Sequence, residues 1–138
     1  MKLKIEIDTD LVSNEEFKSV AKRVLYRAMV KMESLAIEKV PVDTGLLKTS
    51  INLFPKSEGH TWYELSDGVD YGIHVEYGTR PHWAPIQPLK EWSKRVLGDE
   101  SAGYAVQHKI AVKGVEAQPF FRPAFDEVKE IWLNTFWE

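Results

Sequence analysis

Pro41-Val42-Asp43-Thr44-Gly45-Leu46 is the stretch that decides the fold, because the period of the apolar residues changes across it. After it, β-branched and aromatic residues alternate with polar ones, which is typical of strands. Before it, apolar residues recur at spacings of three and four, as on one face of a helix: Phe17, Val20, Ala21, Val24, Ala28, Met32 and Leu35. The stretch therefore separates a helical part of the chain from a part that is rich in strands.

The helix before this stretch is predicted over residues 14–39. Ser13 and Glu16 have the spacing of a capping box, and Pro41 disfavours helical geometry in the residue that precedes it. Further upstream, apolar residues alternate with charged ones from Leu3 to Ile7, which predicts a short half-buried strand.

Three strands are predicted after Gly45, over residues 49–54, 61–65 and 71–77. Segments rich in Ser, Asp and Gly separate them, so we expect hairpin turns and an antiparallel meander of three or four strands. In the last of these strands, His74 and Glu76 should lie on the polar face. The sequence thus predicts an α+β fold in which this sheet packs against the long N-terminal helix and a C-terminal helix.

Helices are also predicted in the second half of the chain. Residues 85–96 fit a short helix that stops at Gly98, and a closing helix should begin near Arg122. Residues 101–113 fit either a strand or a helix, and the helix is favoured because Gly114 would be its C-terminal cap. No internal repeat or low-complexity tract interrupts this order.

Length and composition predict one domain over residues 1–138. The formal net charge is −3, and no Lys or Arg run has the length of a phosphate-binding surface, so sequence-specific nucleic-acid binding is not expected. Cysteine is absent, which excludes disulfides and thiol catalysis. Neither a signal peptide nor a membrane span is predicted, and we expect the protein to work in the cytoplasm or in a particle assembled there.

Asp43-Thr44-Gly45 matches the triplet around the catalytic Asp of aspartic proteases, in which two subunits of a dimer would each supply one Asp. In such enzymes the triplet follows an apolar strand, whereas here it follows a helix and Pro41. The structural interpretation is therefore favoured: Asp43 or Thr44 caps a turn, and Gly45 adopts backbone angles that other residues avoid.

A metal site formed by His74, Glu76 and His82 is the other chemical possibility, but two residues of one predicted strand and a distant third are a weak ligand set. A solvated polar face is the more frequent role of such residues. No motif for a nucleophile, phosphate loop or cofactor is present, so we expect no enzyme activity, no cofactor and no small-molecule substrate.

Two residues stand out as candidates for subunit contacts. Arg80 follows a predicted strand end at Gly78, where a planar guanidinium could pair with a carboxylate of another subunit. Trp137 lies beside the end of the chain, where full burial is difficult, so it could serve as an aromatic anchor.

Three motifs stand out by their order and spacing. Their residues are Pro41, Asp43, Thr44, Gly45 and Leu47, then Tyr71, Glu76, Gly78 and Thr79, and finally Ala117, Gln118, Pro119, Phe120, Pro123 and Ala124. Together these motifs resemble the tail-completion, or head-tail joining, proteins of long-tailed bacteriophages. The resemblance spans about residues 14–130, and residues 82–115 look like a less diagnostic insertion.

The resemblance implies a structural virion protein without catalytic residues. It would be a ring-forming subunit, with a hexamer as the implied ring, at the head-proximal end of the tail, in contact with neck or adaptor and tail-tube proteins. An acidic protein suits a lumen through which DNA must slide. A dimeric aspartic protease that uses Asp43 and a small regulatory binding domain are the alternatives. The latter would be expected to show a basic groove or a helix-turn-helix, which the sequence does not contain.

Overall fold

The structure is a computed structural model that describes residues 1–137, apart from the side chains of Leu133, Thr135, Phe136 and Trp137. The elements follow in the order β1 (Lys2–Glu6), α1 (Glu15–Lys39), α2 (Leu46–Ser50), β2 (Asn52–Phe54), β3 (Trp62–Ser66), α3 (Gly72–Tyr77), α4 (Ile86–Leu97), α5 (Ala102–Lys113) and α6 (Phe121–Trp137). This order confirms the predicted α+β fold with a long N-terminal helix and a C-terminal helix.

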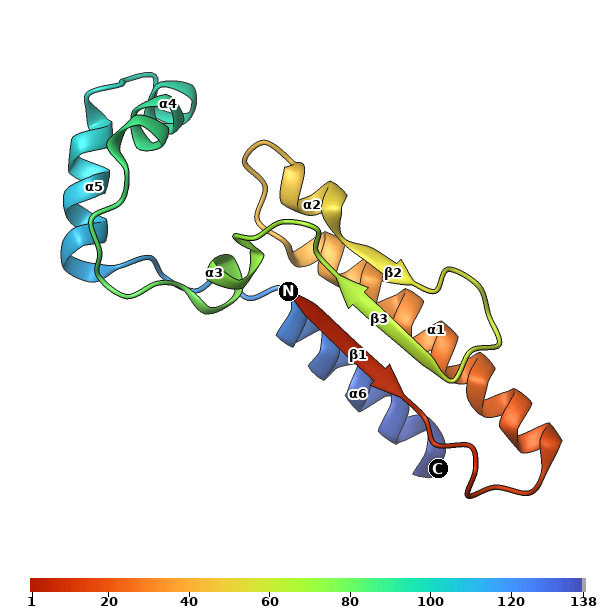
Figure 1. Ribbon diagram of the computed structural model, residues 1–138. Coiled ribbons are helices and arrows are strands. Elements are labelled where there is room, and N and C mark those ends of the chain that lie inside the picture. The colour runs from red at the N-terminus through yellow and green to blue at the C-terminus, as the bar shows by residue number, and fades with distance from the viewer. Residues whose placement is uncertain (138) are drawn as a thin grey trace. The chain divides into compact units, whose positions relative to one another are not determined.

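The sheet has three antiparallel strands in the order β1-β3-β2. The central strand β3 alternates buried and less buried residues, and Tyr63 and Leu65 are fully buried. Ile5 of β1 is opposite Tyr63, and Leu53 of β2 is opposite Leu65. Helices α1 and α6 lie side by side against one face of this sheet (Figure 1), so the apolar residues of the strands are covered on that side.

Helix α1 begins one residue later than the proposed capping box requires. Its N-cap is Asn14, not Ser13, and the Asn14 side chain accepts hydrogen bonds from the backbone N–H groups of Glu16 at 2.9 Å and Phe17 at 3.2 Å. Asn is as good an N-cap as Ser, so the pattern of polar residues alone could not separate the two.

The buried face of α1 differs in part from the predicted stripe. The predicted residues Met32 and Leu35 are buried, whereas Phe17 and Val20 are exposed. The first half of the buried face is instead formed by Leu25 and Met29. Helix α1 therefore exposes more apolar side chains to solvent than a strictly amphipathic helix would.

Two of the three strands predicted after Gly45 need correction. Residues 71–77 form helix α3, not a strand, and residues 49–54 are divided between the end of α2 and the short strand β2. The prediction of a strand at residues 61–65 is confirmed by β3. The third strand of the sheet is β1, which reaches β3 from the N-terminus, so the predicted connection by consecutive hairpins holds only for β2 and β3.

The chain divides into two compact units. Unit 1 comprises residues Met1–Glu76 and Gln118–Glu138, and unit 2 comprises residues Tyr77–Ala117. Unit 1 contains the sheet, α1, α2, α3 and α6, whereas unit 2 contains α4 and α5. The region that the sequence marked as an insertion, residues 82–115, therefore lies within unit 2.

Unit 2 is a pair of helices that pack against each other. The sequence favoured a helix over residues 101–113, and α5 with its C-cap Gly114 confirms it; α4 likewise ends at Gly98. Lys90 of α4 binds Glu100, ahead of α5, with 2.9 Å between the ammonium and carboxylate. This hydrogen bond raises the pKa of Lys90 and lowers the pKa of Glu100. Both side chains are partly exposed to solvent, so this ion pair contributes little to the stability of the fold.

None of the helices described over residues 1–137 combines the length and the apolar composition needed to cross a membrane.

Candidate functional site

The carboxylate of Glu76 caps helix α6 from inside the protein. One oxygen, Oε2, accepts hydrogen bonds from the backbone N–H groups of Phe120 at 2.7 Å and Phe121 at 2.9 Å, and Oε1 accepts one from Arg122 at 2.9 Å. Glu76 is only 1% exposed. The first N–H groups of a helix have no partner within the helix and carry partial positive charge, so a carboxylate is well suited to this position.

Because residues 71–77 form helix α3, the carboxylate of Glu76 reaches the start of α6. Glu76 lies in the last turn of α3, and the backbone C=O of Val75 beside it accepts a hydrogen bond from Gln118 at 2.8 Å. Two motifs that are about forty residues apart in the sequence, Tyr71–Thr79 and Ala117–Ala124, are thereby joined through residues of unit 1.

The two chain segments that enter and leave unit 2 pair with each other inside that unit. Thr79 and Val115 exchange backbone hydrogen bonds in both directions, at 2.9 Å and 3.1 Å, and form an isolated antiparallel bridge. With the Glu76 cap directly before unit 2 and the bridge at its first residues, residues 77–117 form a closed loop. We refer to Glu76, Gln118 and this Thr79–Val115 bridge as the closure.

Gly78 lies at the closure and requires glycine for two reasons. Its φ is +71°, in the left-handed region, and an added Cβ would be 2.5 Å from the backbone oxygen of Val115 and 2.8 Å from the nitrogen of Ala117. Gly45 has a φ of +86° but nothing within 4 Å of an added Cβ. The prediction that both glycines have backbone angles that other residues avoid is confirmed.

We expect Gly78→Ala to destabilise the protein more than Gly45→Ala. Gly45→Ala adds only the cost of a left-handed residue, about 1 kcal/mol. Gly78→Ala also brings its Cβ too close to backbone atoms and should cost about 2 kcal/mol or more. Urea unfolding followed by circular dichroism measures both. Equal losses of unfolding free energy in the two variants would contradict the close approach at Gly78.

The first motif lies between α1 and α2. Asp43 and Thr44 are exposed on the bend, and Gly45 occupies the N-cap position of α2. Leu47 is 5% exposed and belongs to the core. In this motif, Leu47 therefore packs in the core and the chain turns at Gly45.

The polar face that was expected at His74 and Glu76 does not exist. His74 is exposed, but Glu76 is buried and its two oxygens already accept three backbone hydrogen bonds. The His82 ring nitrogen Nδ1 is 2.8 Å from the backbone oxygen of Arg80. Within residues 1–137, no three His, Asp or Glu side chains gather in a way that could hold a metal ion.

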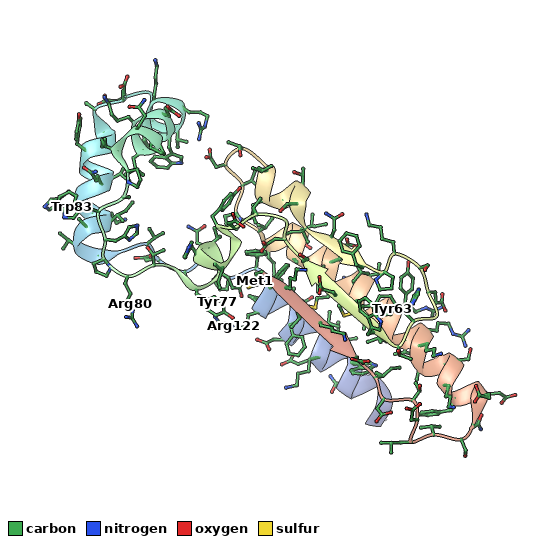
Figure 2. All side chains as sticks on the ribbon, viewed as in Figure 1. Met1, Tyr63, Tyr77, Arg80, Trp83 and Arg122 are labelled. Atoms are coloured by element: carbon green, nitrogen blue, oxygen red, sulfur yellow. The ribbon has the colours of Figure 1, made fainter. Side chains whose placement is uncertain are left out.

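The remaining predicted site residues fall into two groups. Phe120 is fully buried, Pro41 and Pro123 are half-buried, and these residues fix the architecture of unit 1. Tyr71, Gln118, Pro119 and Arg80 are exposed, and Figure 2 shows the Arg80 side chain projecting away from the ribbon of unit 2. Trp137, the other candidate for subunit contacts, lies outside the described side chains.

Sequence reasoning missed a second buried carboxylate. Asp67 is 5% exposed, and its Oδ1 is 2.8 Å from the amino group of Met1. The same carboxylate lies against Gly72, the first residue of α3, where an added Cβ would overlap it. The composition of Ser66-Asp67-Gly68 indicated only a turn. The amino group of Met1 reaches Asp67 because β1 pairs with β3.

Comparison of the chain with protein-family models, with curated protein sequences and with solved structures finds no match. The likeness to tail-completion proteins therefore depends on the three motifs themselves.

Proposed function

We propose that the protein is a structural virion component: a ring-forming subunit at the head-proximal end of a phage tail that acts in tail completion and head-tail joining. The observation that carries this proposal is the closure, in which Glu76 of the second motif caps the helix that follows the third motif. The acidic residue of the motif acts on the protein's own backbone, which supports an architectural role for the motif.

The surroundings of Asp43 do not favour the protease alternative. Asp43 and Thr44 are exposed on a bend between two helices, whereas the catalytic Asp of such enzymes shares a proton with a second Asp in a protected site. The small regulatory domain has no observation in its favour either, because no basic groove was found in the sequence.

The proposed partners follow from the resemblance. Identical copies would form the ring, with six copies as the implied number, and neck or adaptor and tail-tube proteins would contact it. A ring of identical subunits needs head-to-tail contacts, in which two different surfaces of the chain meet. The proposed location is the virion, with the host cytoplasm as the place of assembly.

Deletion of the gene from a phage that carries it tests this proposal. We expect filled heads together with unjoined or abnormally terminated tails in electron micrographs, because tails without the subunit cannot be completed or joined. Plasmid-borne wild-type protein should restore joined particles, and so should the Asp43→Asn variant, which would inactivate an aspartic protease. Normal particles from the deletion would contradict the proposed function, and failure of the Asp43→Asn variant alone would favour the enzyme.

A further inference from the structure

Strand β1 forms an open edge of the sheet. Within residues 1–137 it pairs with β3 alone, because the strand order is β1-β3-β2. The N–H of Ile7 donates to Thr61 at 2.8 Å, and the C=O of Met1 accepts from Asp67 at 3.1 Å, so the odd-numbered residues bond toward β3. Residues of an antiparallel pair alternate in this respect, so the backbone groups of the even-numbered residues point outward. These residues are Lys2, Lys4 and Glu6.

The opposite edge of the sheet is covered. The N–H of Leu53 in β2 donates to the carboxylate of Glu33 on α1, at 2.9 Å. A charged side chain over an edge strand is one way in which proteins prevent the addition of a further strand. Of the two edges, β1 is therefore the one that is accessible to a further strand.

A groove of about 520 Å³ opens along β1. Apolar side chains from β1, α1 and α6 form much of its lining: Leu3, Ile5, Met29, Phe125, Val128 and Trp132. Its charged lining residues are Lys4, Glu6 and Lys129. Figure 1 shows α6 running along β1. A strand added beside β1 would place every second side chain on the face of the sheet that the helices cover, so its apolar residues would enter this groove.

The open edge and the apolar groove together select a peptide as the occupant. A lipid chain could fill the groove, but it would offer no hydrogen-bond partner to the outward backbone groups of β1. An extended peptide satisfies both features, because its main chain bonds to the edge while its alternate side chains fill the groove.

Steric reasons disfavour a second folded copy at this edge. Antiparallel pairing of two β1 strands about a two-fold axis would put the helices of both copies on the same face of the joined sheet. Adjacent strands are about 4.8 Å apart, whereas packed helices need about 8–10 Å between their axes. The two copies of α6 would therefore collide. An extended segment that carries no helix avoids this collision.

The charges along β1 indicate the composition of that segment. Lys4 pairs with Glu6 at 2.9 Å and Lys2 with Glu64 at 3.2 Å. Such ion pairs at the surface are weak and can exchange partners. In an antiparallel segment, acidic residues opposite Lys2 and Lys4 and a basic residue opposite Glu6 would each face an opposite charge. The ammonium of Lys129 in the groove lining also favours a segment with acidic residues.

We propose that β1 receives an extended segment of a partner protein as a fourth, antiparallel strand. Its apolar residues enter the groove, and they alternate with acidic residues opposite Lys2 and Lys4 and with a basic residue opposite Glu6. Antiparallel pairing continues the pattern of the sheet and is slightly more stable than parallel pairing. The inference does not depend on the proposed function, because it concerns only the edge and the groove of unit 1.

NMR titration of the isotope-labelled full-length chain with a synthetic peptide tests this proposal. The probe is the capped peptide Lys-Leu-Lys-Ile-Glu-Ile-Asp, which has the sequence of residues 2–8 but carries no helix. Paired antiparallel with its central Ile opposite Ile5, it places Asp opposite Lys2, Glu opposite Lys4 and Lys opposite Glu6. We expect amide shifts along β1. Hydrogen exchange should become slower at the amides of Lys2, Lys4 and Glu6, because these gain hydrogen bonds.

An exchange of charges tests the pairing at Lys4. The peptide Lys-Leu-Lys-Ile-Lys-Ile-Asp should bind the wild-type chain about fivefold more weakly than the first peptide, since one opposite pair becomes a like pair. It should bind the Lys4→Glu variant better than the Lys56→Glu variant. Lys56 is exposed beyond β2, at the other edge, so this matched control has the same net charge.

Three results would overturn the proposal. The first is that the peptide shifts no amides of β1, or only those of β2. The second is that the Lys4→Glu and Lys56→Glu variants bind both peptides equally well. The third is that β1 amides shift with protein concentration when no peptide is present, because the occupant would then be a second copy of the chain. The comparison of the two peptides on the wild-type chain remains decisive if the Lys4→Glu variant does not fold.

Discussion

Replacing Glu76 with Ala is expected to lower the free energy of unfolding by about 3 kcal/mol or more. The substitution removes the acceptor of three backbone N–H groups, those of Phe120, Phe121 and Arg122, the first two of which donate in buried surroundings. A buried donor that loses its partner costs about 1–3 kcal/mol, and hydrogen bonds to a charged group are at the upper end of the scale. Water can reach part of this site, so the sum should be smaller than three full penalties.

Two further variants separate the cap from a general effect of removing an acidic side chain. Glu76→Gln keeps one oxygen of similar geometry but loses the charge and the second acceptor, so its stability should lie between those of the wild type and Glu76→Ala. Glu116→Ala changes an exposed residue in the segment that leaves unit 2, and it should change stability by less than about 0.5 kcal/mol. Urea denaturation followed by circular dichroism measures all three. Equal stability of the Glu76→Ala and Glu116→Ala variants would show that the cap contributes little.

The helices were the part of the fold that the sequence predicted best. A stripe of apolar residues over 25 positions indicated α1, and glycine stops indicated the ends of α4 and α5. These signals are local, because a helix forms its backbone hydrogen bonds within its own segment. The exact face of α1 was less well predicted, since Leu25 and Met29 compete with Val24 and Ala28 for burial, and only the position of the sheet decides between them.

Residues 71–77 show why the sheet was harder to predict. Tyr71, Ile73, Val75 and Tyr77 alternate as in a strand, but a run of seven residues also fits two turns of helix. The helix prevails in the structure, where it places Glu76 at the N-terminus of α6, a partner more than forty residues ahead in the sequence. The strand that completes the sheet is β1, which pairs with β3 across about sixty residues. The local sequence pattern indicates neither of these two long-range contacts.

The sequence predicted which residues form the candidate site, but not what those residues do. The motifs singled out Glu76, Gly78 and Phe120, and the structure joins the first to the third by a hydrogen bond. From the sequence, however, Glu76 was assigned to a solvated face. An acidic residue two positions before a glycine, ahead of the insertion, together with Gln-Pro-Phe after the insertion, is the signal that could have identified a helix cap.

Replacing Phe120 with Ala is expected to cost about 3–5 kcal/mol of unfolding free energy, as for other large aromatic side chains removed from a core. Phe120 is fully buried, and its ring packs against Phe121 with 4.7 Å between the centroids. Phe17→Ala is the matched control, because Phe17 on α1 is 54% exposed and should contribute less than about 1 kcal/mol.

The double variant with Glu76→Ala and Phe120→Ala tests whether the cap and the core act as one unit. The backbone N–H of Phe120 donates to Glu76 while its ring anchors the same residue in the core, so each interaction holds the start of α6 in place for the other. Once one is lost, the helix start can move, and the second substitution should then cost less. We therefore expect the double variant to be more stable than the sum of the single losses predicts, by about 1 kcal/mol or more, as for residues that share contacts. Additive losses within about 0.5 kcal/mol would mean that the core holds α6 without help from Glu76, and the closure would then serve unit 2 alone.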